Sequence, residues 1–128
     1  MQVSSGLLSI GLAGLTSMAL AAPVLAHHGW GWTRSEISEI EGIITGIYVG
    51  NPHATLDVDV DGTAWRVELA PPGPTMQAGF TENTAAPGDR VTAIGNRSVD
   101  ENEARMKAVR IVIDGTSYDV YPSRAQNI

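Results

Sequence analysis

The feature that most constrains the fold of this chain is a dipeptide, Asp61-Gly62, set between two runs of alternating apolar and polar residues. A two-residue Asp-Gly turn requires positive φ at both positions and joins two antiparallel strands in a defined register. That register places Leu56 opposite Val67 and Asp57 opposite Arg66, so the apolar side chains share one face and the charged ones share the other. The sequence therefore predicts a β-hairpin with one buried face.

The same pattern returns near the C-terminus, around Asp114-Gly115. Here the two-residue turn places Ile111 opposite Tyr118 and Arg110 opposite Asp119. Turn chemistry that recurs independently explains the likeness of the two hairpins better than a duplication does. Two hairpins of this kind predict a β-rich domain.

The segments outside the hairpins supply the rest of the predicted domain. Residues 40–49 and 91–95 are rich in β-branched side chains and predict further strands. A short helix is expected from Pro74 to Phe80, because proline tolerates the first helical position. About six strands and one short helix indicate an all-β fold, a small closed or half-closed barrel.

The chain is divided by composition into four segments. Residues 1–26 carry no charged side chain, and the small residues Val24 and Ala26 precede the expected peptidase cut. We therefore expect a signal peptide over 1–26, export to the periplasm and a mature chain that begins at His27; the alternative is an uncleaved membrane anchor. An N-terminal arm (27–38), the barrel domain (39–122) and a C-terminal tail (123–128) follow.

The composition excludes several function classes. The net charge is −6, and an acidic domain repels the phosphate backbone, so no nucleic-acid partner is expected. The chain has no cysteine, which excludes disulfides and thiolate metal sites. No nucleophile elbow, phosphate-binding glycine loop or Ser-His-carboxylate set can be placed in the sequence. We expect a protein that is not an enzyme and that does not contact membranes after cleavage.

The chain has three histidines: His27, His28 and His53. After cleavage, the α-amine and ring of His27 together with the ring of His53 offer three nitrogen ligands in a T-shaped set, and His28 is a further ligand. Such nitrogen-rich coordination favours Cu(II). The alternative is an ordinary surface histidine and a terminus that binds copper only adventitiously.

Three other residues belong to this predicted site. Extending the hairpin register backwards puts His53 on the outer face, with Glu68 diagonal to it and able to orient its ring. Trp30 and Trp32 in the arm either pack it against the barrel or form an exposed stripe that contacts a partner. Packing is the favoured interpretation, since an arm needs an apolar anchor to stay ordered.

Several segments of the mature chain together point to a known family: His27-His28-Gly29-Trp30, Gly42–Ile47, Asn51-Pro52-His53-Ala54, Trp65–Pro72 and Pro87–Val91. Across essentially the whole mature chain, they resemble an uncharacterised family of small bacterial periplasmic proteins, catalogued as a domain of unknown function. The resemblance implies a small OB-like β-barrel, export, and a pairing of the first two histidines with the third. It implies no activity.

We therefore predict an exported copper-handling protein that binds Cu(II) through His27 and His53. The alternative is a metal-free periplasmic binding module that contacts another periplasmic protein, such as an oxidoreductase, or a small ligand. A copper mono-oxygenase would share the ligands but lacks the large flat substrate surface expected of one, and it ranks last. The sequence leaves the oligomeric state open.

Overall fold

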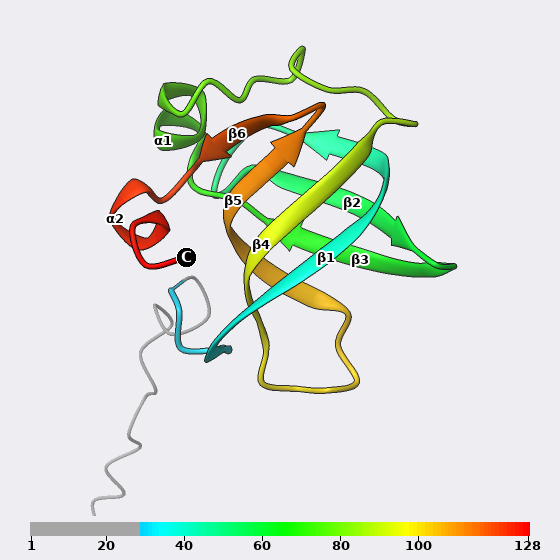
Figure 1. Ribbon diagram of the computed structural model, residues 1–128, viewed down its shortest axis with the longest axis vertical. Helices are drawn as coiled ribbons and strands as arrows, with labels where there is room; N and C mark the ends of the chain where they lie inside the picture. Colours follow the sequence, from blue (N-terminus) through cyan, green and yellow to red (C-terminus); the bar gives the residue numbers. More distant parts are fainter. Residues whose placement is uncertain (1–28) are drawn as a thin grey trace, which may run out of the picture.

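The computed structural model describes residues 29–128; the predicted signal peptide, its cleavage site, His27 and His28 lie outside the described residues. Figure 1 shows a strongly curved sheet with two short helices at its periphery. The elements in chain order are β1 (Thr33–Tyr48), β2 (Thr55–Val60), β3 (Thr63–Glu68), α1 (Pro72–Gln77), β4 (Arg90–Ser98), β5 (Arg105–Ile113), β6 (Thr116–Asp119) and α2 (Pro122–Ala125).

The sheet closes on itself to form a barrel. Its strand order is β3-β2-β1-β4-β5-β6, and a parallel pairing of β3 with β5 joins the two sides. The long strand β1 serves both halves, pairing with β4 through its first part and with β2 through its last part. A register shift between Ile44 and Gly46 lies where β1 pairs with β2, and such bulges bend a strand. The predicted fold class, an all-β OB-like barrel of about six strands with one short helix, is confirmed, and the described chain adds a second short helix.

Both predicted hairpins form in the predicted register. Leu56 pairs with Val67 and Asp57 with Arg66, while the second hairpin pairs Ile111 with Tyr118. The turn residues have positive φ, 51° and 87° in the first turn and 49° and 75° in the second. A turn of this type twists in the same sense as the strands it joins. Local chemistry alone therefore sets the register of two strand pairs.

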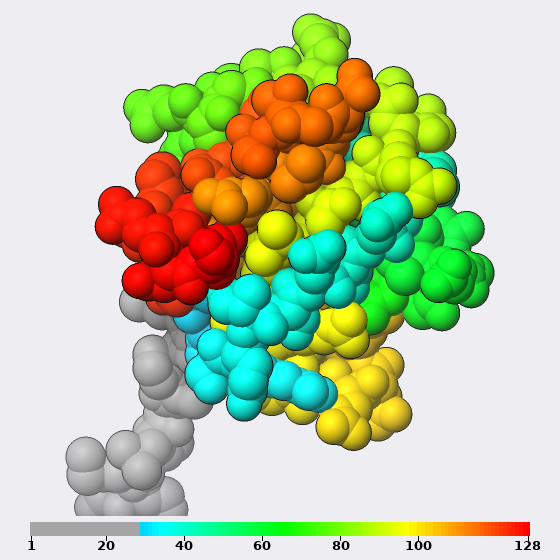
Figure 2. Space-filling model, viewed as in Figure 1, coloured from blue at the N-terminus to red at the C-terminus, as the bar shows by residue number. Residues whose placement is uncertain are grey.

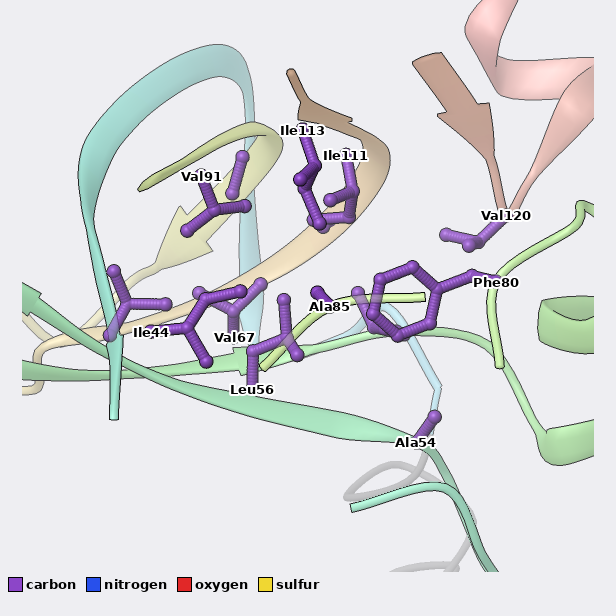
Figure 3. Packing of buried hydrophobic residues seen from close by; sticks show 14 of the residues in the cluster. Ile44, Ala54, Leu56, Val67, Phe80, Ala85, Val91, Ile111, Ile113 and Val120 are labelled. Atoms are coloured by element: carbon purple, nitrogen blue, oxygen red, sulfur yellow. The ribbon is translucent and has the colours of Figure 1, made fainter. Parts of the chain in front are cut away.

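The core lies inside the barrel and is built from the inward residues of every long strand. Leu56, Val67 and Ile111 are fully buried there, and Phe80, which follows α1, is buried among them (Figure 3). Period-two alternation explains this selection, because each strand turns every second side chain inward. Charged residues such as Asp57, Arg66 and Arg105 take outward positions on β2, β3 and β5.

Three boundaries differ from the sequence-based expectation. The first strand begins at Thr33, so residues 33–38 of the stretch expected as an arm belong to β1, and Thr33, Ile37 and Ser38 pair with β4. The Asn96 side-chain amide supports this stretch by donating to the carbonyl of Arg34 at 3.0 Å, a contact that residue patterning cannot reveal. The first helix begins at Pro72 and not at Pro74. A second short helix, α2, overlaps the segment expected as a tail.

Candidate functional site

His53 lies in a hollow on the outer face of the barrel. The hollow has a volume of about 480 Å³ and is lined by Tyr48, Pro52, His53, Thr55, Asp57, Arg66, Glu68 and Arg105. These residues come from the last residue of β1, from the β1–β2 loop, from the outward positions of β2 and β3, and from the first residue of β5. The sequence prediction that His53 shares the outer face with Thr55 and Asp57 agrees with this lining.

The backbone on either side of His53 is well supported. Beyond the regular ladder, Ala54 N–H donates to Ala70 O at 3.0 Å, and Leu69 N–H donates to Ala54 O at 2.8 Å. These bonds extend the β2–β3 pairing towards the loop, and Ala54 is fully buried. His53, next to this anchored residue, is half-buried. The histidine is therefore presented by a rigid edge of the hairpin.

The wall of the hollow opposite the hairpin is the β1–β2 loop. The Tyr48 hydroxyl donates to the carbonyl of Asn51 at 2.8 Å and lies across Gly50. A Cβ at Gly50 would lie 2.5 Å from the Tyr48 oxygen, so only glycine permits this contact. The loop thus holds an aromatic side chain at the rim of the hollow.

The charges in the hollow are paired. Arg66 Nε donates to Asp57 Oδ1 at 2.7 Å. Arg105 donates to Glu68 through Nη2 and to Glu103 Oε1 at 3.3 Å through Nη1. Glu68, predicted to orient His53, lines the same hollow, and its Oε1 accepts from Arg105. Both carboxylates are thus already engaged by guanidinium groups.

The arm is attached to the barrel beside this hollow. Trp30 packs edge-to-face on Tyr121 with ring centroids 5.0 Å apart, and the guanidinium of Arg124 lies 3.8 Å from the Trp30 ring centroid. The guanidinium of Arg105 lies 3.9 Å from the ring centroid of Trp32. Cation–π contacts of this kind contribute about 0.5–2 kcal/mol each, depending on burial. Figures 1 and 2 show the C-terminal segment, in red, beside the start of the described chain.

Lys107 lies beneath the arm and is the only lysine in the sequence. It is 2% exposed, and its Nζ donates to the carbonyl of Gly29 at 3.1 Å. The same Nζ lies 4.8 Å from the Trp30 ring centroid and 5.7 Å from that of Tyr121. Desolvation lowers the pKa of Lys107, although the Glu68 carboxylate acts in the opposite direction.

The buried phenol beside the arm has a shifted pKa of its own. Burial raises the pKa of Tyr121 to about 12, and the Glu68 carboxylate adds to the increase while Arg124 opposes it. Tyr121 Oη also points to the carbonyl of Leu69 at 3.5 Å. A phenol with this pKa stays protonated at neutral pH, so it acts here as a donor and a packing surface.

The hollow and the attachment of the arm meet at adjacent strands. Glu68 is the Cα partner of Thr55 on one side and of Lys107 on the other. Because aligned residues of neighbouring strands point to the same side of a sheet, these three share the outer face. Glu68 is therefore shared between the hollow of His53 and the residue that holds Gly29.

The structure brings some predicted site residues together and adds others. His53 and Glu68 share a hollow, and Trp30 and Trp32 contact barrel cations, whereas His27 and His28 lie outside the described residues. Within residues 29–128, no three histidine, aspartate or glutamate side chains come close enough to hold a metal ion. Sequence reasoning missed the cationic and aromatic side chains that hold the arm: Arg105, Lys107, Tyr121 and Arg124. A single lysine in an otherwise apolar stretch of strand was the available signal.

No helix in the described part of the chain has the length and apolar character needed to cross a bilayer.

Comparison with known families and structures agrees with this architecture. The fold is that of a small OB-like barrel, and the outer face of this barrel carries His53. The chain belongs to the family of unknown function DUF6152, whose model matches residues 14–107. No curated protein matches the chain.

Solved structures show the same fold at low identity. The barrel is similar to a chain of the S. pombe Stn1–Ten1 complex, with 18% identity and a TM-score of 0.50 over 71% of this chain and 63% of that one. It is also similar to the ZRD-deleted mutant of TiaS in complex with agmatine, with 19% identity and a TM-score of 0.51 over 70% of this chain and 27% of that one. This chain thus spans less than two thirds of either structure.

Proposed function

We propose that this protein is an exported, non-enzymatic copper-binding protein of the periplasm. After removal of residues 1–26, the α-amine and ring of His27 bind Cu(II) together with the ring of His53, and His28 assists. The observation that carries this proposal is the attachment of Gly29 to Lys107, because it holds the start of the described arm on the same face as His53.

The distances on that face are compatible with a shared site. Lys107 and Thr55 are two strands apart, and neighbouring strands are about 4.8 Å apart, so two spacings are about 10 Å. His53 is two residues before Thr55, a step of about 6.7 Å along the strand direction, which makes the total roughly 12 Å. Two extended residues ahead of Gly29 reach about 7 Å. Imidazole side chains and two metal–nitrogen bonds of about 2 Å each cover the remainder.

The donor chemistry favours copper over oxygen-seeking ions. Asp57 and Glu68 are each paired with an arginine, so the carboxylates of the hollow are poorly available to a hard cation. Amine and imidazole nitrogens remain, and Cu(II) has the highest affinity for such ligands among the divalent ions of the first row. The ordinary pKa is about 8 for an α-amine and about 6.5 for an imidazole, so a metal ion has to displace few protons from these ligands at neutral pH.

The experiment compares Cu(II) affinity by competition titration for chains that begin at His27. One variant carries an extra alanine ahead of His27, and another carries His53→Ala; each is expected to bind at least tenfold more weakly. Thr55→Ala is the matched control, because Thr55 lines the same hollow but has no nitrogen ligand. If both the alanine extension and His53→Ala bind as tightly as the parent, the copper proposal is wrong. Mass spectrometry of the exported protein checks the His27 start beforehand.

A second readout uses the scarcity of amines. Lys107 is the only lysine and is 2% exposed, so an amine-reactive reagent reads chiefly the α-amine of a mature chain. Copper bound through that amine should slow its modification strongly, and the alanine-extended chain should lose this protection. Equal modification rates with and without one equivalent of copper would contradict a role for the amine.

The metal-free binding module is the second candidate, and the hollow itself favours it. A concavity of about 480 Å³ with an aromatic rim at Tyr48 and two ion pairs offers a polar contact for another periplasmic protein, such as an oxidoreductase, or for a small ligand. Because Trp30 and Trp32 are engaged by barrel cations, the hollow is the better contact surface. Failure of the copper experiment would leave this function in place.

A further inference from the structure

We infer that Lys107 is a positioning residue whose buried ammonium group fixes Gly29 and Trp30 and thereby sets where the N-terminal nitrogen atoms lie relative to His53. This inference rests on the proposed function for its consequence in copper binding. Its structural half, that one ammonium group holds the arm in place, stands on contacts in the described chain.

The contacts of Lys107 converge on the arm from a buried position. Its Nζ donates to the Gly29 carbonyl, which precedes Trp30 by one residue, and it faces the Trp30 ring at 4.8 Å. The guanidinium of Arg124, from α2, lies 3.8 Å from the same ring centroid, and Tyr121 meets the ring edge-to-face. The indole is thus held between cations from β5 and α2.

The choice of a charged residue at this position is costly. Burying an ammonium group carries a desolvation penalty unless hydrogen bonds and charges compensate for it. Arg105 and Arg124 add repulsion, whereas the Glu68 carboxylate adds attraction. An apolar side chain such as methionine would cover the β3–β5 seam without this penalty. Lysine differs in supplying a directional donor to a carbonyl of the arm, together with a charge for the indole face.

The consequence is a defined starting point for the residues ahead of Gly29. A chain tethered only by apolar packing slides and rotates, because apolar contacts have no preferred direction. A hydrogen bond is directional, so the Lys107 bond fixes Gly29 ahead of Trp32, whose own carbonyl accepts from Val99 N–H at 3.0 Å. Because Lys107 aligns with Glu68, Gly29 is held on the outer face that also carries the hollow of His53.

The first test needs no metal. In isotope-labelled chains that begin at His27, NMR should show contacts between the Trp30 and Tyr121 rings and rigid Gly29 and Gly31 amides. Lys107→Met removes donor and charge, and Lys107→Gln removes the charge and places its N–H donor one bond closer to the backbone; we expect both to lose the ring contacts and to mobilise the two amides. Arg110→Gln is the control, because Arg110 is a cation on the same strand whose partner is Asp119, outside the arm.

The outcomes decide the inference whichever variant folds. Contacts between Val67 and Met106 across the β3–β5 pairing report a closed barrel in each variant. If a folded Lys107 variant keeps the Trp30–Tyr121 contacts and the rigid amides, the inference is overturned. If Arg110→Gln loses them as well, the effect is a general one of removing charge from β5, and the inference is likewise overturned.

The second test is the Cu(II) electron paramagnetic resonance spectrum and affinity. A positioning role predicts that Lys107→Met gives the spectrum of His53→Ala and at least a tenfold weaker affinity, although Lys107 is not a ligand. If the copper signal of the parent chain does not depend on His53, the proposed function is wrong. The NMR result still decides the role of Lys107 in that case. A parent signal that depends on His53 and is unchanged in Lys107→Met overturns the inference alone.

Discussion

The β2–β3 hairpin and the attachment of the arm to β5 lie on neighbouring strands, but they are specified in opposite ways. In the hairpin, Asp57 and Arg66 pair across a separation of nine residues in the sequence. In the arm, Gly29 and Lys107 meet across a separation of 78 residues. The first contact is settled by the turn between the strands, whereas the second exists only once the barrel has closed.

The two regions also differ in what stabilises them. The inner face of the hairpin consists of fully buried aliphatic residues such as Leu56 and Val67. The arm is held by hydrogen bonds, among them those from Lys107 to Gly29 and from Val99 N–H to the carbonyl of Trp32, and by cations over indole rings. Burial of aliphatic area is the larger and less specific contribution, and cation–aromatic contacts are smaller and directional. We therefore expect the arm to be able to detach while the barrel stays folded.

The strongest test of this difference is a pair of truncations. Leu56→Ala opens a cavity in the core and should lower the free energy of unfolding by about 3 kcal/mol, within the range for buried leucine. Trp30→Ala removes the indole between two cations and should cost only about 1 kcal/mol in a urea titration. Equal losses would show that the arm belongs to the cooperative core, and the comparison would fail.

A smaller effect is expected at the hairpin turn. Gly62 has φ of 87°, and a Cβ there would touch nothing within 4 Å, so Gly62→Ala tests backbone strain alone. We expect a loss of about 1 kcal/mol, because positive φ is disfavoured for residues with a Cβ. Gly73→Ala in α1 is the matched control, since it also meets open space and has no positive φ; alanine should stabilise that helix slightly. A neutral Gly62→Ala would mean that the turn does not set the register.

The hairpins were predictable because their information is local. Alternation around Asp61-Gly62 and Asp114-Gly115 predicted the turns, the registers and the charge pairs, including the bond between Arg110 and Asp119 at 2.6 Å. The position of His53 on the outer face followed from the same register. A pattern with a period of two carries this information because a slip of one residue would expose the core.

The arm was not predictable in the same way. Thr33–Tyr48 begins seven residues before the expected strand, because its first part lacks apolar alternation and is held by β4 and by Asn96. Lys107 faces Glu68 only through the parallel β3–β5 pairing, which closes the barrel and joins distant segments. No spacing in the sequence reports such a contact. The sequence therefore predicted part of the candidate site. His53 and Glu68 were found, whereas the cations that hold the arm were missed.

The smallest expected effect is a dependence of stability on alkaline pH that belongs to the arm and not to the hairpin. The pKa of Lys107 is lowered by desolvation, so between that value and the ordinary lysine pKa of about 10.4 the unfolded chain binds more protons than the folded one. Stability contributed by this group therefore rises with pH across that window. Tyr121 acts oppositely, because its folded pKa of about 12 exceeds the ordinary value, and stability falls as the unfolded phenol ionises above about pH 10.

Urea titrations from pH 8 to 11 should accordingly show Lys107 and Tyr121 contributions that each change by about 1 kcal/mol or less, with a maximum near pH 10. Lys107→Met should remove the rising limb, and Tyr121→Phe should remove the falling one. Arg66→Gln, which breaks an exposed pair in the hairpin, should leave both limbs in place, because an arginine stays charged throughout this range. If Arg66→Gln flattens the profile as much as Lys107→Met does, the pH dependence belongs to the hairpin. The contrast between a pH-insensitive hairpin and a titratable attachment of the arm would then be wrong.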